Sequence, residues 1–437
     1  MRDGDTIVAL SSGAVPAGVA VIRLSGPDVP NILNGIAGGI PEPRRLTLRP
    51  IGADVVLDRG LIAYFPAPHS FTGEDCAELQ VHGSPAGVRA ILRLCTGLGA
   101  RLAEAGEFTR RAFENGKLDL VEAQGLGDLI EAETENQRAL AYVRMEGGLT
   151  RRVESWRERL LDLRAVIEAQ LDFSDEGDVG ELPQSFLTEA QALRGDIGSV
   201  LALRGQGRII RSGFRVVLAG PPNAGKSSLL NALSQSDVAI VSDEAGTTRD
   251  LKEVPLDLEG QLIILIDSAG LRDTASKAEA IGVDRARQAM VQADLVLWLQ
   301  AADQVAETKP EFTDVNQHLR PPVLIVGTKH DLGIVPGAQT SVSAATGEGL
   351  AELLTKILDA SGARHVRAAD VLVSHEQDRA ALLAAFRELT EVESLLEQSE
   401  LAAERLRGSS MALERLLGRI DAEAVLDRLF ASFCIGK

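Results

Sequence analysis

The spacing of hydrophobic positions divides the chain into blocks of different texture. The first 117 residues carry short β-rich apolar runs separated by Gly and Pro, for example at 19–22 and 61–64. From about 118 to 211 the apolar residues instead recur every three or four positions, as on one face of an amphipathic helix. Members of that stripe are Val153, Trp156, Leu160, Leu163, Ile167 and Leu171. We therefore predict a small α+β domain at 1–117, followed by long helices.

The helical texture returns near the C-terminus, after an intervening block. At 212–365, strand-like and helix-like segments alternate, which is typical of a doubly wound parallel sheet. At 366–437, Ser374 and Gln377 form a capping-box helix start ahead of a new apolar stripe. Each helical block alone would leave its stripe uncovered. We therefore predict that 118–211 and 366–437 pack as one helical domain into which an α/β domain is inserted.

Composition narrows the functional classes. The chain has 437 residues and a formal net charge of −18, so a bulk electrostatic grip on nucleic acid is not expected, although a local basic patch stays compatible with it. The three cysteines, Cys76, Cys95 and Cys434, form neither a metal-spaced pair nor a disulfide framework, as is usual in a reducing cytosol. The start of the chain has no apolar signal core, and no run is long enough to span a bilayer. We predict a soluble, cytoplasmic protein.

A phosphate-binding loop is predicted at 220–228. A strand-like run at 216–219 leads into Gly-Pro-Pro-Asn-Ala-Gly-Lys-Ser, which matches G-x-x-x-x-G-K-[ST], and a helix-like run follows. Glycines let backbone N–H groups wrap the phosphates, Lys226 offers a cation to the β and γ phosphates, and Ser227 is a Mg²⁺ ligand. The alternative is a glycine-rich turn with a chance lysine, and such a turn needs neither the strand nor the helix beside it.

Four downstream motifs, in this order, favour GTP as the nucleotide. They are Gly-Thr-Thr-Arg-Asp at 246–250, Asp-Ser-Ala-Gly at 267–270, Thr-Lys-His-Asp at 328–331 and Ser-Val-Ser-Ala-Ala at 341–345. In the second motif, Asp267 is placed to hold Mg²⁺ and the Gly270 amide to sense the γ-phosphate. Asp331 can accept from both N1–H and the exocyclic amine of guanine, a donor pair that adenine lacks. Each motif is weak alone, but their order at strand ends predicts a GTPase.

Two positions depart from the usual GTPase pattern. Thr328 stands where the motif N-K-x-D has Asn. A hydroxyl replaces only part of an amide's hydrogen bonding, so we expect nucleotide affinity to change more than base identity. Leu271 follows the D-x-x-G motif, where Ras-like switches carry the Gln that orients the attacking water. Leucine cannot do this, so we expect another group to position the water.

Several segments outside the nucleotide site carry a family resemblance. They are Phe-Thr-Gly-Glu-Asp at 71–75, Gly-Glu-Phe-Thr at 106–109, Asn-Gly-Lys-Leu-Asp-Leu at 115–120 and Phe-Cys-Ile-Gly-Lys at 433–437. Other small GTPases lack these four segments. Together with 220–231, 246–250 and 267–272, they make essentially the whole chain similar to the MnmE (TrmE) family of tRNA-modification GTPases.

This resemblance implies an architecture and a reaction. The N-terminal domain, 1–117, would bind formyl-tetrahydrofolate and form a homodimer, and the helical domain, 118–211 with 366–437, would carry the GTPase domain, 212–365, as an insert. An FAD-dependent MnmG-type partner would complete a heterotetramer. The acidic composition of this chain further suggests that this partner makes much of the contact with tRNA. Together they would modify C5 of the wobble uridine, position 34, with a one-carbon unit from 5-formyl- or methylene-tetrahydrofolate. GTP would be the substrate of the GTPase domain, with Mg²⁺ and K⁺ as cofactors.

The resemblance also implies site residues, position by position. K⁺ would be held by Asn223, Ser242, Thr247 and the carbonyl of Glu244, and Mg²⁺ by Ser227 and Thr248. Catalysis would depend on Lys226, Arg249 and Glu279, of which Glu279 falls at the water-positioning glutamate. The nucleotide would contact Asn223, Ala224, Gly225, Lys226, Ser227, Ser228, Ser242, Thr247, Thr248, Asp267, Ser268, Ala269, Gly270, Thr328, Lys329, Asp331, Ser343 and Ala344. The folate would contact Arg23, Glu78, Lys117 and Lys437.

Without the resemblance, Glu279 and the folate residues would be interpreted as solvated surface charges. Cys434 stays open between a catalytic thiol beside the folate and a buried small hydrophobe. The apolar run at 433–435 predicts that the C-terminal tail docks on the N-terminal domain, in the same chain or across a dimer, which would bring Lys437 to the folate.

Two other functions compete with this one. An Era-like ribosome-assembly GTPase would use GTP only to gate docking on RNA, and such proteins usually carry a basic RNA-binding appendage. This chain is acidic and ends in Gly-Lys instead. A non-catalytic scaffold with an inactive P-loop is the second competitor. It is disfavoured because Lys226, Ser227, Thr248 and Asp267 are all present.

Overall fold

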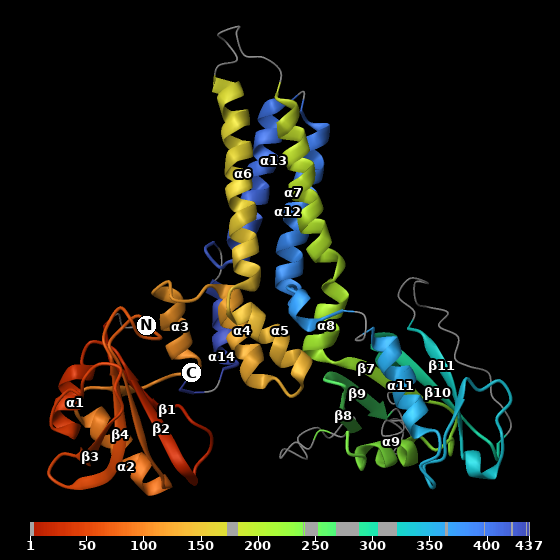
Figure 1. The fold of residues 1–437 in the computed structure, drawn as a ribbon, viewed down its shortest axis with the longest axis horizontal. Helices are drawn as coiled ribbons and strands as arrows, with labels where there is room; N and C mark the ends of the chain where they lie inside the picture. Colours follow the sequence, from red (N-terminus) through yellow and green to blue (C-terminus); the bar gives the residue numbers. More distant parts are fainter. Residues whose placement is uncertain are drawn as a thin grey trace, which may run out of the picture. The chain divides into compact units, whose positions relative to one another are not determined.

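The structure of the protein, a computed structural model, is drawn in Figure 1. The chain divides into two compact units, Met1–Gly127 with Ser410–Lys437, and Asp128–Ser409. The residues that the structure describes are 4–172, 182–238, 240, 252–267, 288–304, 321–362, 366–396, 398–420, 423–433 and 435–436.

A six-stranded sheet is the frame of the first unit. Its strands lie in the order β3-β4-β5-β2-β1-β6, and all neighbours are antiparallel except β1 and β6. The register places Arg23 of β2 opposite Glu78 of β5. Because side chains alternate along a strand, both lie on the face opposite to the buried Ile22 and Leu79. The strands are β1 (Ile7–Leu10), β2 (Ala17–Ser25), β3 (Thr47–Gly52), β4 (Val56–Phe65), β5 (Cys76–Gly83) and β6 (Arg101–Leu102).

Helices pack on both faces of this sheet. On one face, α1 and α2 contribute Ile32 and Ile91 to a core shared with the strands. On the other face, α3 places Phe108 against Ile7 of β1. Further along the chain, α4 and α14 pack together through Leu120 and Phe430. The bounds are α1 (Val29–Ala37), α2 (Pro85–Gly97), α3 (Glu107–Glu114), α4 (Leu120–Glu131) and α14 (Glu423–Ala431).

The long helices of the second unit carry the predicted apolar stripe. Val153, Trp156, Leu160, Leu163 and Ile167 of α6 are all buried; Leu171, at the end of the stripe, is half-buried. Helix α7 packs along α12, and the Phe386 ring lies so close to Gly198 that a Cβ there would come within 3.1 Å. Helices from before and after the α/β segment therefore pack together. The bounds are α5 (Glu135–Met145), α6 (Gly148–Asp172), α7 (Gln184–Ala202), α8 (Arg204–Ser212), α12 (Glu376–Ser394) and α13 (Ser399–Leu416).

The segment between α8 and α12 is a doubly wound α/β fold. Its sheet has the order β12-β11-β10-β7-β9-β8, parallel throughout except that β8 is antiparallel to β9. Strand order reverses at β7, and ligands of such sheets bind where the order reverses. Short 3-10 turns, His330–Leu332 and Ala368–Asp370, follow β11 and precede α12. The bounds are β7 (Phe214–Ala219), α9 (Lys226–Ser234), β8 (Lys252–Leu258), β9 (Gln261–Asp267), β10 (Leu295–Ala301), β11 (Val323–Thr328), β12 (Thr340–Ser341) and α11 (Leu350–Ser361).

The predicted fold class is thereby confirmed, with α+β, helical and doubly wound α/β parts in one chain.

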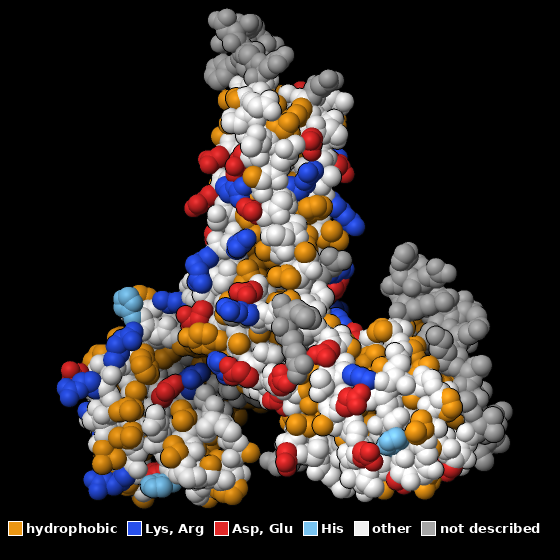
Figure 2. Space-filling model, turned by 45° about the vertical axis from the view of Figure 1, so that its right-hand side comes forward, with side chains coloured by type: hydrophobic (Ala, Val, Ile, Leu, Met, Phe, Trp, Pro, Cys, Tyr) orange, Lys and Arg blue, Asp and Glu red, His pale blue; other side chains and the backbone are white. Residues whose placement is uncertain are grey.

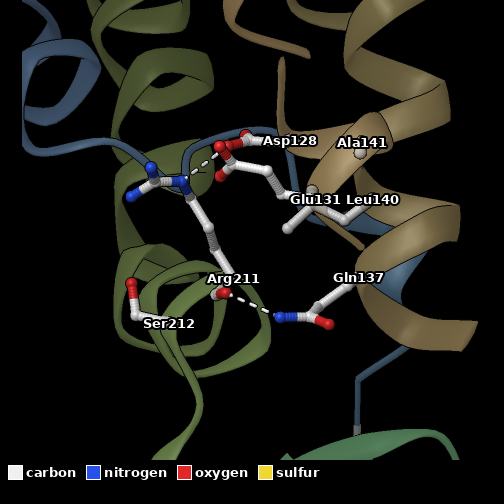
Figure 3. A pocket seen from close by; sticks show the side chains of 7 residues that line it. All are labelled: Asp128, Glu131, Gln137, Leu140, Ala141, Arg211 and Ser212. Carbon is white, nitrogen blue, oxygen red and sulfur yellow. Dashed lines mark hydrogen bonds and ion pairs between the residues drawn. The ribbon is translucent and has the colours of Figure 1, made fainter. Parts of the chain in front are cut away.

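The end of α8 and the start of α12, which flank the α/β segment, both contact the carboxylate of Asp128. Arg211, in the last turn of α8, donates from Nε to Oδ1 of Asp128 at 2.8 Å, and Nε2 of His375, next to α12, lies 2.8 Å from Oδ2. Gln137 donates to the Arg211 carbonyl at 2.9 Å. Asp128, Gln137 and Arg211 line a cavity of about 150 Å³ (Figure 3). Burial alone would raise the pKa of Asp128. The hydrogen bonds and charges of His375 and Arg211 outweigh burial and hold that pKa below its ordinary value.

Candidate functional site

The phosphate-binding loop is shaped by two glycines with positive φ. Gly220 follows β7 at φ +145°, and a Cβ there would lie 2.4 Å from the carbonyl oxygen of Leu299 in β10, so only glycine lets the strands approach so closely. Gly225, at φ +86°, directly precedes α9, which begins at Lys226. The loop therefore brings a helix N-terminus, a natural anion-binding element, to the edge of the sheet.

Lys226 lies over this loop. Its side chain is buried, and Nζ donates to the carbonyls of Gly220 at 2.9 Å and Pro221 at 2.8 Å. Ala224 is buried under the loop, whereas Asn223, at φ +62°, is exposed. The exposed Ser227 and Ser228 complete the predicted phosphate-side residues in this part of the chain. The Lys226 ammonium is thus held on the loop from which α9 begins.

Ser227 and Asp267 meet although they lie on different elements. Ser227 is in the first turn of α9, Asp267 ends β9, and the hydroxyl donates to Oδ2 of the carboxylate at 2.7 Å. Asp267 is buried. Hydroxyl and carboxylate oxygens are the hard donors that Mg²⁺ prefers. The residues present therefore fit a Mg²⁺ site, with one donor from each side of the loop.

The predicted base-recognition residues also converge. The buried hydroxyl of Thr328, at the end of β11, donates to the Ala224 carbonyl of the P-loop at 2.7 Å. The exposed Asp331 accepts from the buried Ser343 hydroxyl at 2.6 Å, which fixes the carboxylate beside β12. Lys329, at φ +55°, pairs with Asp303 at 2.7 Å. The half-buried Ala344 directly follows Ser343.

Part of the predicted nucleotide site lies outside the described residues. This part comprises Ser242, Glu244, Thr247, Thr248, Arg249, Ser268, Ala269, Gly270, Leu271 and Glu279. Cys434 and Lys437 of the predicted folate pocket also lie outside them.

Two of the predicted folate residues form a pair on the face of the first unit's sheet that also carries Phe108 of α3. Arg23 donates from Nε and Nη2 to Oε1 of Glu78, at 3.1 and 2.9 Å, and both side chains are about a quarter exposed, at 23% and 27%. The guanidinium carbon lies 5.7 Å from the ring centre of Phe71 and 5.8 Å from that of Phe108, within cation–π range. The pair is therefore rigidly held and partly accessible.

Lys117 reaches the same neighbourhood from another segment. Its Cε atom lies 3.2 Å from where a Cβ on Gly73 would be, so its stem packs on the turn that carries Phe71. Gly73 has φ +81°, a conformation that glycine adopts without strain. The structure thus places Lys117 next to the 71–75 turn, whose Phe71 contacts Arg23.

The C-terminal tail docks on the first unit within the same chain. Ile435 forms an antiparallel bridge with Ala105, and the Ser11 hydroxyl donates to the Gly436 carbonyl at 2.8 Å. A Cβ on Gly436 would come within 2.3 Å of the Leu10 carbonyl oxygen. The predicted docking is confirmed for these residues. However, Ile435 is 63% exposed, so the tail is held mainly by backbone contacts rather than by full burial of its apolar residues.

A buried ion network beneath this region was missed by sequence reasoning. The guanidinium of Arg111, 7% exposed, pairs with Asp5, Glu74 and Glu107, and Arg101 pairs with two of the same acids. Burial alone would raise the pKa of Asp5. The hydrogen bonds from Arg101 and Arg111 outweigh burial and hold that pKa below its ordinary value. Glu74 and Glu107 fall in motifs that carry the resemblance. The spacing of Glu107 and Arg111, four residues apart on α3, could have indicated their pair, but nothing in the sequence links Arg111 to Asp5 or Glu74.

A second polar chain adjoins this network. The Ser25 hydroxyl lies 2.6 Å from both the Thr72 hydroxyl and Oε2 of Glu74, and Thr72 lies 3.1 Å from Sγ of Cys76. Ser25 and Cys76 are opposite one another in the β2–β5 register, two residues along from Arg23 and Glu78. The chain therefore ties the 71–75 turn to the strands that carry the candidate pocket.

Fold and site together define a P-loop GTPase joined to helical and α+β parts. Family models agree with this arrangement: the GTP-binding protein TrmE N-terminus matches residues 6–117, and the MnmE helical domain matches residues 120–434. The G domain of the T. maritima FeoB iron transporter is 28% identical over 34% of this chain and 98% of its own, with a TM-score of 0.23.

Relatives extend the similarity over the full length. The tRNA modification GTPase MnmE of Rhizobium johnstonii is 48% identical, over 99% of both chains. That of Brucella canis is 46% identical, over 99% of this chain and 98% of its own. That of Rhizobium meliloti is 47% identical over all of both chains. The chain belongs to the MnmE family of tRNA modification GTPases.

It is accordingly a GTP hydrolase, and family membership implies that it binds GTP and Mg²⁺. The Era-like alternative is not favoured. Within the described part of the chain, none of the helices has both the length and the apolar composition needed to traverse a bilayer.

Proposed function

We propose that this protein is a K⁺-dependent GTPase that works with an FAD-dependent MnmG-type partner on tRNA. Together they would modify C5 of the wobble uridine, position 34, with a one-carbon unit from methylene- or 5-formyl-tetrahydrofolate. The observation that carries the GTPase half is the convergence of Lys226, Ser227 and Asp267 at one loop. The folate half is carried by the Arg23–Glu78 pair.

On the GTP side, each residue has a distinct task. Lys226 and the amides at the start of α9 bind the phosphates, while Ser227 and Asp267 hold Mg²⁺. Asp331, oriented by Ser343, reads the guanine. When bound, Mg²⁺ and K⁺ neutralise charge that develops on the phosphate oxygens. Glu279 and Arg249 would act on the attacking water and the phosphates from segments outside the described residues.

K⁺ is proposed at the P-loop because Leu271 cannot orient water as a glutamine does, so another group must assist the reaction. The exposed amide of Asn223, on a residue with positive φ in the loop, offers the oxygen donor that K⁺ needs. Ser242, Thr247 and the Glu244 carbonyl complete the proposed ligand set.

On the folate side, Glu78 is suited to accept hydrogen bonds from the pterin donors, because both hydrogen bonds from Arg23 go to its other carboxylate oxygen, Oε1. Cations at Arg23, Lys117 and Lys437 match the carboxylates of the glutamate tail. The family resemblance adds Cys434 of the C-terminal tail to the residues proposed beside this pocket.

Homodimer formation is supported by an apolar patch at the edge of the first unit's sheet. β3 is an edge strand, and Leu46, Leu48, Val55 and Val56 around it are 56–71% exposed. Figure 2 shows hydrophobic side chains gathered on the visible face of this unit. An unpaired apolar edge favours association with another chain. We propose that a second copy of this chain, rather than tRNA, covers this edge. A net charge of −18 does not favour binding of tRNA here, so the FAD-dependent partner would make most of the contact with tRNA.

Two measurements test the proposal. GTP turnover should be much faster in K⁺ than in Na⁺ at equal ionic strength, and Asn223→Ala should remove the difference; equal rates in both salts would contradict the K⁺ assignment. Separately, the purified protein should co-elute with an FAD-containing partner and tRNA, and modify position 34 only when the tetrahydrofolate is supplied. Modification without any folate would contradict the one-carbon source.

A further inference from the structure

The side chain that departs from the guanine motif, Thr328, has a partner in the P-loop. It is 4% exposed, and its hydroxyl lies 2.7 Å from the Ala224 carbonyl and 3.3 Å from the Gln300 carbonyl. Both neighbours are acceptors only, so the hydroxyl must be the donor. A threonine hydroxyl has one hydrogen, and the shorter contact, to Ala224, takes it.

This hydrogen bond connects two elements that are 104 positions apart in the sequence. Ala224 directly precedes Gly225, the αL residue from which α9 starts. The Thr328 side chain also packs on this turn, because a Cβ on Gly225 would lie 3.6 Å from its Cβ and Oγ1 atoms. The end of β11 therefore holds the turn that aims the α9 amides.

An ordinary buried threonine at a strand end could satisfy its hydroxyl within its own sheet. Gln300 of the neighbouring β10 offers such an acceptor, yet its carbonyl is the more distant of the two. Because the hydroxyl donates to the P-loop carbonyl instead, the hydrogen bond connects β11 to the P-loop rather than only satisfying a buried hydroxyl within the sheet.

We propose that Thr328 is a positioning residue that tethers the P-loop and gives no hydrogen bond to the base. This inference rests on the proposed nucleotide site. An asparagine amide carries two N–H donors and a carbonyl, so it can hold Ala224 and still reach a purine acceptor. Thr328 has only one donor, and it donates that hydrogen to the Ala224 carbonyl of the P-loop. Guanine selectivity then rests on Asp331, and the bound nucleotide is released faster than an asparagine at this position would allow.

The test measures release of a fluorescent (mant) GDP from the full-length protein by stopped flow. Thr328→Val keeps the side-chain shape but removes the donor, so release should accelerate about tenfold. Thr328→Ser restores the donor and should stay within about twofold of wild type. Thr328→Asn should slow release about fivefold, because it adds a donor. Preference for GDP over ADP should be unchanged in all three variants.

Thr355→Val is the matched control, because Thr355 donates to Ala351 within α11, on the exposed surface of that helix. It should release nucleotide at the wild-type rate. Wild-type release from Thr328→Val would refute the tether, and unchanged or faster release from Thr328→Asn would refute the missing base contact. Lys226→Ala separates this failure from that of the site: if it still binds GDP as wild type does, the proposed nucleotide site itself is wrong.

Discussion

The nucleotide site takes its phosphate loop, the Lys226 ammonium and the Mg²⁺ donor Ser227 from a single stretch, 220–228. The candidate folate pocket instead takes each of its groups from a different part of the chain. Arg23 and Glu78 meet through the pairing of β2 with β5, Lys117 comes from beyond α3, and the tail arrives from the C-terminus. The phosphate-binding side of the first site is therefore local, whereas the second site exists only when the whole unit is folded.

This difference predicts how damage spreads. A substitution in the P-loop should remove GTP chemistry and leave the first unit intact. A substitution that weakens the first unit should lose folate binding while the GTPase continues to turn over, because the two sites belong to separate compact units.

Deletion of 433–437 gives the largest expected effect. It removes the Gly436 carbonyl that Ser11 holds, the Ile435 bridge and Lys437 itself. Binding of 5-formyl-tetrahydrofolate, measured by calorimetry, should be lost together with tRNA modification, while intrinsic GTP hydrolysis is largely retained. Ser11→Ala, which removes one hydrogen bond only, should weaken folate binding far less. Unchanged folate affinity in the truncated protein would show that the tail only packs.

Lys226→Ala tests the other side of the comparison. Loss of the buried cation over the P-loop should lower GTP turnover about a hundred- to a thousandfold, the usual cost of removing one preorganised charge from a phosphoryl-transfer site. Folate binding by calorimetry should not change. Lys356→Ala, on α11, is the control, because Lys356 pairs with Glu352 away from the loop. Parallel loss of folate binding would mean that the two units depend on each other.

Arg111→Gln sharpens the comparison at the level of stability. It leaves Asp5, Glu74 and Glu107 clustered without their shared buried guanidinium, which should destabilise the first unit by about 3 kcal/mol. Thermal unfolding should show one transition moving down while GTP affinity is retained. The neighbouring Arg110→Gln should move the transition little, because Arg110 pairs with the exposed acids Glu114 and Asp427. Equal shifts for both variants would contradict a special role for the buried network.

Asp128→Asn should give the smallest effect, about 2 kcal/mol, by weakening two charge-assisted hydrogen bonds. Because the folded-state pKa of Asp128 is lowered, its stabilisation is present above the ordinary value of 3.8 and is lost as the pH falls through the folded-state value. Denaturant unfolding of wild type and variant should therefore differ at neutral pH and converge in acid, once the pH is below the folded-state pKa of Asp128. A difference that persists unchanged in acid would contradict the ionic origin.

Sequence reasoning reached the features that depend on neighbours in the chain. The strand, glycine loop and helix around Lys226, and the buried stripe from Val153 to Ile167, follow from local pattern because periodicity and turn chemistry are local. The separate predictions that Ser227 and Asp267 hold Mg²⁺ followed from their motifs, and the structure brings the two side chains together.

Sequence reasoning did not predict the contacts between residues that the fold brings together from distant parts of the chain. The Arg23–Glu78 pair depends on the β2–β5 register. The resemblance named the two residues as folate contacts, but nothing in the sequence predicted that they pair. The bonds from Asp128 to His375 and from Thr328 to Ala224 each join distant positions, and no spacing in the sequence specifies them. Such contacts follow only from how the sheets and helices close in three dimensions.

The joint at Asp128 also bears on how such a chain can arise. Residues 211 and 375 contact the same carboxylate, so the two ends of the intervening segment lie within one side chain of each other. A segment whose ends already meet closes almost no extra loop in its host, so its length and content hardly affect the folding of the helices around it. For protein engineering, the contacts at Asp128 mark an insertion point. We expect that a short linker from α8 to α12 can replace the α/β segment, and that another domain whose ends lie close together can be inserted there.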